Sequence, residues 1–188
     1  MQSPHSFIVR PVNGRRYDNI KKIGDIDFIT SVSKEDHKTS NRQAEVVSTP
    51  LNYSGDIEKG DILLVHHNVF KFYFDMKGRE KSGKSFFKDD LFFIDNDQFF
   101  LYNKKGKWHG HDKYCFVKPI PKKDYYLKGL NTNEEPLHGV IKYTNKQLEQ
   151  LGINEGDEVC FTPDSEYEFY VDSEKLYRMF TNNITLAL

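Results

Sequence analysis

Short runs of apolar residues recur along the whole chain, separated by Gly, Asp, Asn and Lys. Aromatic and β-branched side chains dominate these runs, which is typical of strands. The pattern predicts strands at 7–12, 26–30, 44–48, 61–66, 69–74, 91–94, 98–102, 114–120, 139–143, 158–162, 167–171 and 184–188. One short helix is predicted at 146–151, with Thr144 as its N-cap and Gly152 at its end. Because no long helical periodicity is present, we expect an all-β chain of small barrels with little helix.

Four of these runs recur in the same order later in the chain. The matched pairs are 57–65 with 153–161, 71–75 with 168–172, 8–12 with 116–120, and 44–47 with 139–142. The first pair shares isoleucine, glycine and aspartate, and an apolar strand follows each Gly-Asp. The order favours a tandem repeat. The alternative is two unrelated β-rich halves that share a common turn.

The repeat predicts two domains, 1–112 and 113–188, because the polar stretch 104–112 is typical of a hairpin or linker. The first domain is the longer one and contains aromatic hairpin insertions around 86–100. Domains this small bury only about 60% of their unfolded surface, so each core is expected to be modest.

A long polar segment, 13–43, follows the first predicted strand, whereas the corresponding segment of the second copy, 121–138, is shorter. Within it lie three apolar residues, Ile26, Phe28 and Ile29. Long segments between strands are usually functional or disordered, and apolar residues in a polar segment suit docking to a partner. The alternative is that 26–30 is a further strand of the barrel.

Each copy resembles the co-chaperonin GroES family. That family has an opening apolar strand, a mobile loop with an apolar tripeptide, a Gly-Glu-Val-type strand, a Val-Gly-Asp turn that begins an apolar strand, and a closing apolar strand. The corresponding parts of the first copy are 7–12, 24–30, 44–47, 59–65 and 99–102, and those of the second are 116–120, 139–141, 155–161 and 184–188. The chain thus looks like a divergent double-domain member, similar to the plastid form and compatible with a viral source.

The resemblance implies a co-chaperonin that caps a chaperonin ring and helps enclose unfolded protein substrates. It implies no enzyme, cofactor or metal in the chain itself, since the ring hydrolyses ATP. Ile26, Phe28 and Ile29 would bind the chaperonin. Asp27, which interrupts the apolar tripeptide, and Ala44, which replaces the usual Gly, depart from the family pattern.

The resemblance also implies a homo-oligomer in which the last strand of one barrel pairs with the first strand of the next. Within the chain, 99–102 would pair with 114–120. Between chains, 184–188 would pair with 7–12, and these inter-subunit strands would carry Ile8, Val9, Ile184 and Leu186. Such pairing would cover two sheet edges.

The 188 residues have a net charge of −1, and 14% of them are aromatic. The near-neutral balance does not favour nucleic acid or anionic lipid as partners, and the aromatic content argues against disorder. No apolar run approaches the roughly 18 residues of a membrane span. Cys115 and Cys160 are too few for a disulfide framework. Because residues 1–5 lead directly into a strand-like run, a cytoplasmic protein is expected, in the host cytoplasm if the source is viral.

Residues 78–85 match the phosphate-binding P-loop pattern letter for letter. A P-loop begins a helix, whose N-terminus holds the anion. Too few residues separate Ser85 from the next strand, at 91–94, for a helix and a return crossover. We therefore interpret the stretch as a hairpin in which Lys84 lies on an exposed turn.

Two further patterns were weighed against simpler explanations. His109 and His111 would share one face of a strand and could bind a metal with Cys115 or Asp112, but no tight Cys/His spacing supports such a site, so we interpret them as part of a solvated hairpin. Lysines beside Trp108 would suit single-stranded nucleic acid. A small-barrel binding protein or viral structural protein of that kind, without a chaperonin partner, is the alternative function.

Overall fold

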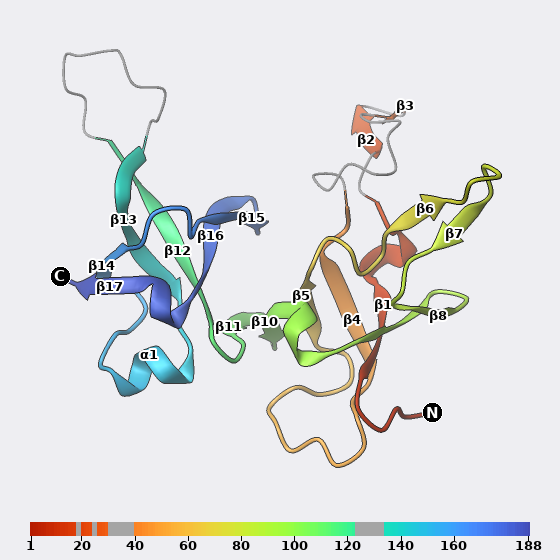
Figure 1. Cartoon of the computed structure of the whole chain (residues 1–188), viewed down its shortest axis with the longest axis horizontal. Coiled ribbons are helices and arrows are strands. Elements are labelled where there is room, and N and C mark those ends of the chain that lie inside the picture. Colours follow the sequence, from red (N-terminus) through yellow and green to blue (C-terminus); the bar gives the residue numbers. More distant parts are fainter. Residues whose placement is uncertain (18–19, 24–25, 30–39, 123–133) are drawn as a thin grey trace. The chain divides into compact units, whose positions relative to one another are not determined.

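The computed structural model describes residues 1–17, 20–23, 26–29, 40–122 and 134–188, and it divides into two compact units, Met1–Lys107 and Trp108–Leu188. The predicted domain boundary, between 112 and 113, lies five residues after this division. Figure 1 shows that strands dominate both units, so the prediction of an all-β chain is confirmed. In the described residues, no helix is long and apolar enough to cross a membrane.

The strands that begin within the first unit form a large sheet and two hairpins. In chain order they are β1 (Phe7–Pro11), β2 (Ile20–Ile23), β3 (Ile26–Ile29), β4 (Gln43–Ser48), β5 (Ile62–Val65), β6 (Phe72–Phe74), β7 (Glu80–Ser82), β8 (Phe86–Lys88), β9 (Leu91–Ile94), β10 (Phe99–Lys104) and β11 (Lys107–Gly110). The large sheet has the order β11-β10-β5-β4-β1-β9-β8, and β2-β3 and β6-β7 are separate two-stranded sheets.

The remaining strands form one six-stranded sheet, accompanied among the described residues by one short α-helix and one 3-10 turn, Thr181–Asn183. The elements are β12 (Tyr114–Pro121), β13 (Glu134–Tyr143), α1 (Lys146–Gln150), β14 (Glu158–Phe161), β15 (Tyr167–Val171), β16 (Glu174–Phe180) and β17 (Ile184–Ala187). The strand order is β15-β16-β12-β13-β14-β17. Neither large sheet is closed by pairing of its end strands in the part of the chain that is described, so barrel closure stays a prediction.

Six strands have the same neighbours in both sheets. The order β10-β5-β4-β1-β9-β8 of the first sheet returns as β17-β14-β13-β12-β16-β15 in the second. The register is also the same: Val9 pairs with Val46 and Val117 pairs with Ile141, and in each case the register shifts one residue earlier, after Ile8 or Phe116 respectively. A one-residue slip would turn every side chain of a strand to the opposite face, so a shared register is strong evidence for one repeated fold. The two sheets thus share one strand order and one register at these positions.

The Gly-Asp turn that precedes β5 fixes this strand against β4. The amide of Gly60 donates to the carbonyl of Val46 at 2.8 Å, and Gly60 has a φ of +94°, in the region that favours glycine. One carboxylate oxygen of Asp61 accepts a hydrogen bond from the amide of Glu58 at 2.8 Å, which closes the turn. The residue types of this turn are thus dictated by its backbone geometry.

The turn before β14 repeats these contacts one by one. The amide of Gly156 donates to the carbonyl of Ile141 at 2.8 Å, with a φ of +96° at the glycine. A carboxylate oxygen of Asp157 accepts from the amide of Asn154 at 2.7 Å. Ile141 occupies the place that Val46 has in the first sheet, so the two turns begin equivalent strands at equivalent positions.

One of the four sequence matches, 71–75 with 168–172, is wrong. In the sheet order β15 takes the position of β8, whereas β6 lies in a separate hairpin with β7. The error arose because alternating aromatic residues are typical of any hairpin strand and do not identify which one it is. The β6–β7 hairpin is therefore an insertion of the first unit.

The strand pairing expected from a ring of barrels is also not what the sheets show. β10 pairs with β5 rather than with β12, so the pairing of 99–102 with 114–120 is wrong. Strand β1, which carries Ile8 and Val9, is paired on one side by β4 and on the other by β9, and so has no edge left for a neighbouring chain. Strand β17, which carries Ile184 and Leu186, is the last in its sheet.

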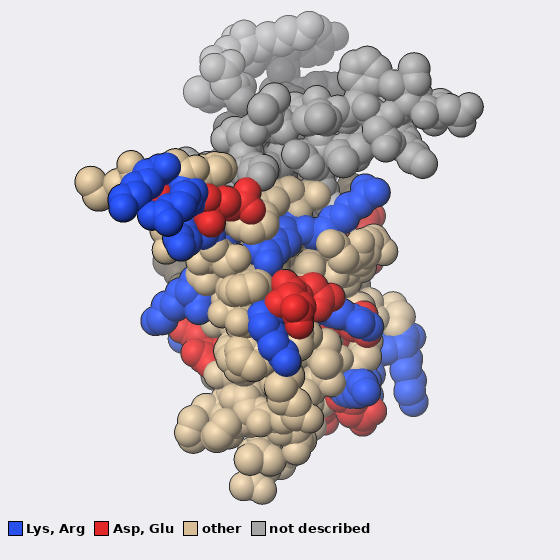
Figure 2. All heavy atoms as spheres, turned by 90° about the vertical axis from the view of Figure 1, so that its right-hand side faces the viewer, with Lys and Arg blue, Asp and Glu red and all other residues tan. Residues whose placement is uncertain are grey.

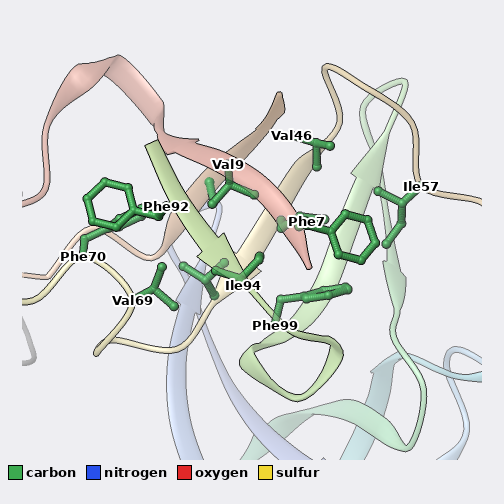
Figure 3. Packing of buried hydrophobic residues seen from close by; sticks show 12 residues of the cluster. Phe7, Val9, Val46, Ile57, Val69, Phe70, Phe92, Ile94 and Phe99 are labelled. Carbon is green, nitrogen blue, oxygen red and sulfur yellow. The ribbon is translucent and has the colours of Figure 1, made fainter. Parts of the chain in front are cut away.

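The core of the first unit consists largely of aromatic and β-branched side chains. Figure 3 shows these side chains turned toward one another from several strands and their connections. Phe7 and Phe99 meet edge to face at 5.4 Å between ring centroids, and Phe70 and Phe92 do so at 4.8 Å. Such pairs each contribute about 1 kcal/mol beyond the burial of their area, which suits a core of limited size.

One buried cluster of the second unit comprises Cys115, Val117, Ile141, Leu148, Val159, Phe161 and Met179. Phe116, Phe169 and Leu176 of this unit are also buried, and the rings of Phe116 and Phe169 meet edge to face at 5.7 Å between centroids. Burial raises the pKa of the Cys115 thiol to about 12, so this cysteine is an inert core residue at neutral pH.

The predicted helix is present as α1, but its cap is Asn145 rather than Thr144. The Asn145 side-chain oxygen accepts from the amides of Gln147 and Leu148, both at 3.0 Å, and its amide nitrogen donates to the carbonyl of Tyr114. Thr144 is buried instead, and its hydroxyl donates to the carbonyl of Ile153. Both residue types are good caps, so sequence alone could not choose between neighbours.

We expect Asp61→Ala and Asp157→Ala each to lower the free energy of unfolding by about 1 kcal/mol, because each removes the acceptor that closes an equivalent turn. Urea denaturation of the full chain measures the change. The controls Asp61→Asn and Asp157→Asn keep a carbonyl acceptor and should lose less. Asn variants as unstable as the Ala variants would contradict this role of the turns.

Candidate functional site

The two ends of segment 18–39 are held together where they join the first unit. Tyr17 and Ser40 form an antiparallel bridge, and the amide of Asn41 donates to the carbonyl of Arg16 at 3.0 Å. The chain therefore leaves the unit and returns to it at one place. We call residues 15–17 and 40–41 the segment base.

Buried polar side chains fix the segment base. Asn41 is 6% exposed, and its side-chain nitrogen donates to the carbonyls of Val12 at 3.1 Å and Arg15 at 2.7 Å. Ser40 is also buried, and its hydroxyl donates to the carbonyl of His67 at 2.8 Å. Because a buried polar group without a partner is costly, these satisfied groups favour this one arrangement of the chain ends.

Arg16 anchors the segment base to the β6–β7 hairpin and its neighbours. The central carbon of its guanidinium lies 4.3 Å from the ring centroid of Phe72, 5.0 Å from Phe86 and 4.8 Å from Phe92, and one terminal nitrogen donates to the hydroxyl of Ser82 at 3.0 Å. Burial lowers the pKa of Arg16, but an arginine in a protein stays charged. The electron-rich faces of the rings stabilise this partly desolvated cation.

Tyr17 makes a second connection to the same hairpin. Its hydroxyl oxygen accepts a hydrogen bond from the amide of Phe72 at 3.0 Å. The rings of Tyr17 and Phe72 are stacked, with 5.9 Å between centroids and 18° between planes. The start of segment 18–39 and the β6–β7 hairpin thus share one support.

The three predicted chaperonin-binding residues belong to β3, whose backbone forms an antiparallel hairpin with β2. Ile26 is paired with Ile23 and Ile29 with Ile20. The alternative of a further strand in the main sheet is wrong, because β3 has β2 as its neighbour among the described residues. The side chains of Ile26, Phe28 and Ile29 lie outside what the structure describes, so their binding role stays a prediction.

The P-loop lookalike is a hairpin, as predicted. Gly78 lies in the turn between β6 and β7, and Lys84 lies on an exposed turn between β7 and β8. A P-loop needs a helix N-terminus behind its glycines, and here a strand follows on each side. The exposed position of Lys84 is confirmed.

The structure does not support the two other sites considered from the sequence, a nucleic-acid platform at Trp108 and a metal site at His109 and His111. Trp108 is 5% exposed, and its ring nitrogen donates to a carboxylate oxygen of Asp172 at 2.9 Å, so it cannot serve as an exposed platform for bases. Across the described ranges, no group of three or more His, Cys, Asp and Glu side chains is placed to hold a metal ion. His109 and His111 are half-buried.

Sequence reasoning missed the residues that build the segment base. Arg16 and Phe72 are far apart in the chain, and neither belongs to a recognisable motif. A cation that packs on an aromatic cluster can be found only once the pairing of the strands is known.

A comparison of the chain with protein-family models and with curated proteins gives no match.

We expect Arg16→Ala to lower the free energy of unfolding by about 2 kcal/mol, because it removes a partly desolvated cation from three ring faces. Arg16→Lys should lose less, since it keeps the charge but not the planar group. Hydrogen exchange at the amide of Phe72 should accelerate in the Ala variant. An Ala variant with the stability of the wild type would show that the cluster contributes nothing.

We expect Lys84→Ala to leave function and stability unchanged, because the side chain is exposed on a turn. Titration calorimetry of the full chain with ATP and Mg²⁺ should detect no binding. Saturable micromolar binding that disappears in Lys84→Ala would revive a nucleotide site.

Proposed function

We propose that this chain is a tandem co-chaperonin that caps a chaperonin ring and assists the folding of enclosed proteins. Support comes from the strands that carried the resemblance to the GroES family. Its opening, middle, post-turn and closing strands correspond to β1, β4, β5 and β10, and again to β12, β13, β14 and β17. In both units these four strands are neighbours in the same order. Short apolar runs alone are a weak basis for a resemblance. The same order of neighbouring strands in both units strengthens it.

The observation that carries the proposal is the segment base. A docking segment benefits from having both ends fixed to a rigid support. Binding then loses conformational entropy only within the segment itself and not in its attachment points. The bridge of Tyr17 to Ser40 and the buried Asn41 supply that support. The backbone pairing of β2 with β3 gives the apolar residues of β3 a defined strand to present.

Asp27 need not interfere with docking. On a strand, neighbouring residues point to opposite faces, so Ile26 and Phe28 share one face and Asp27 belongs to the other. Asp27 is paired with Lys22 across the hairpin, which places opposite charges in one cross-strand pair. A single such segment would bind weakly, and several on one homo-oligomer would bind a ring with multiplied affinity.

We expect the double variant Ile26→Asp, Phe28→Asp to lose capture by a GroEL-type ring in the presence of ATP, because it places two charges on the proposed apolar face. A pull-down measures capture, and a melting curve should match that of the wild type. Ser31→Asp with Ser33→Asp adds the same charge to polar positions of the segment and should still be captured.

Two results would count against this function. Capture of the Ile26 and Phe28 variant at wild-type level would show that the ring does not use β3. A large loss of thermal stability in that variant would show instead that β3 supports the fold.

A further inference from the structure

The β6–β7 hairpin has no counterpart between the equivalent strands of the second unit, β14 and β15. Residues 66–85 connect β5 to β8, whereas only residues 162–166 connect the equivalent strands β14 and β15. The register of the surrounding sheet is the same in both units, so the sheet can be built without the longer connection. The shared fold therefore does not require the hairpin, which suggests a role for it other than building the sheet.

Large apolar side chains are exposed on this hairpin. Tyr73 is 48% exposed, Phe74 is 50% exposed, and Met76 in the turn is fully exposed. Tyr73 pairs with Lys81 across the hairpin, and Phe74 pairs with Glu80, so Tyr73 lies on one face of the ribbon and Phe74 shares the other face with Phe72. Such clustering of exposed apolar side chains is typical of an interaction surface.

The hairpin itself, 72–82, has a net charge of +1, and the residues that flank it, up to Lys88, add to this charge. Residues 71–88 contain six Lys or Arg and two Asp or Glu, a net charge of +4 in a chain whose total is −1. Figure 2, which looks at this side of the first unit, shows Lys and Arg side chains at the surface, interspersed with Asp and Glu side chains. One of the two acids, Asp75, accepts hydrogen bonds from the amides of Lys77 and Arg79, both at 2.9 Å, and so is engaged in the turn. A partner for this surface needs acidic and apolar groups together.

The hairpin and segment 18–39 are attached to the same support. Arg16 lies on the ring of Phe72 and donates to Ser82, and Tyr17 accepts from the amide of Phe72, which ties the first and last residues of the ribbon to the segment base. A partner that binds the segment close to its base therefore meets the hairpin. Two elements on one support share the entropy cost of association, so their contributions to binding reinforce each other.

We infer that the β6–β7 hairpin is a second docking element for the ring that segment 18–39 binds. The inference rests on the proposed function. Tyr73, Phe74 and Met76 supply the apolar contact, and Lys77 and Lys81 meet acidic side chains of the ring. The ring surface recognised by this chain is accordingly acidic around an apolar centre.

The test measures the affinity of the full chain for a GroEL-type ring with ATP, at two salt concentrations. Tyr73→Ser with Phe74→Ser should weaken binding at least about tenfold, since several copies of the contact act together. Lys77→Glu with Lys81→Glu should weaken binding most at low salt. Tyr170→Ser, which changes a tyrosine of β15 that is 62% exposed, is the control and should bind as the wild type does.

Melting curves check that the variants fold. Met76→Ser is the second variant to measure, because the exposed side chain contributes little to the fold and its loss should still weaken binding. The inference is wrong if the Tyr73 and Phe74 variant and the Met76 variant both bind like the wild type while the Ile26 and Phe28 variant does not. The proposed function stands in that case. A wild-type chain that binds no ring overturns both. Binding of a labelled 20-nucleotide oligothymidine that is lost in the Lys77 and Lys81 variant, with ring affinity unchanged, would assign the hairpin to nucleic acid instead.

Discussion

The Gly-Asp turn is the constraint on which both large sheets depend. In each unit it joins the glycine amide to the strand that pairs with the opening strand, and the aspartate closes the turn on itself. Since a slip of one residue would expose the core face of β5 or β14, the turn fixes which side chains are buried. Its recurrence with the same hydrogen bonds explains how the two units keep one strand order.

The two units share this sheet and differ in the connections between its strands. The second unit passes from β14 to β15 by a short connection, whereas the first inserts the β6–β7 hairpin. The inserted ribbon is joined by Arg16 and Tyr17 to the start of segment 18–39. A two-stranded ribbon is marginally stable alone, so these contacts explain how it can hold exposed aromatic residues in place. In the proposed function, this combination makes the first unit the one specialised for the ring.

The sequence was most informative where structure is local. The Gly-Asp turns, most strands and the hairpin around Lys84 follow from turn chemistry and short-range alternation, and the structure agrees. It was least informative where several segments share one local signal. The stretch 71–75 looks like any aromatic strand, and Thr144 and Asn145 are both good caps, so only tertiary contacts decided between the options. The placement of Arg16 on its aromatic cluster depends on strands distant in sequence, which a single sequence does not reveal.

Hydrogen–deuterium exchange of the full chain, alone and with a GroEL-type ring and ATP, tests the central claim most directly. The account predicts slower exchange on binding at 26–29, in β3, and at 72–82, the β6–β7 hairpin that contacts the segment base. Exchange at 167–171, the β15 strand that stands where β8 stands in the first unit, should stay the same. Unchanged exchange at 26–29 and 72–82, or protection confined to the second unit, would contradict the account.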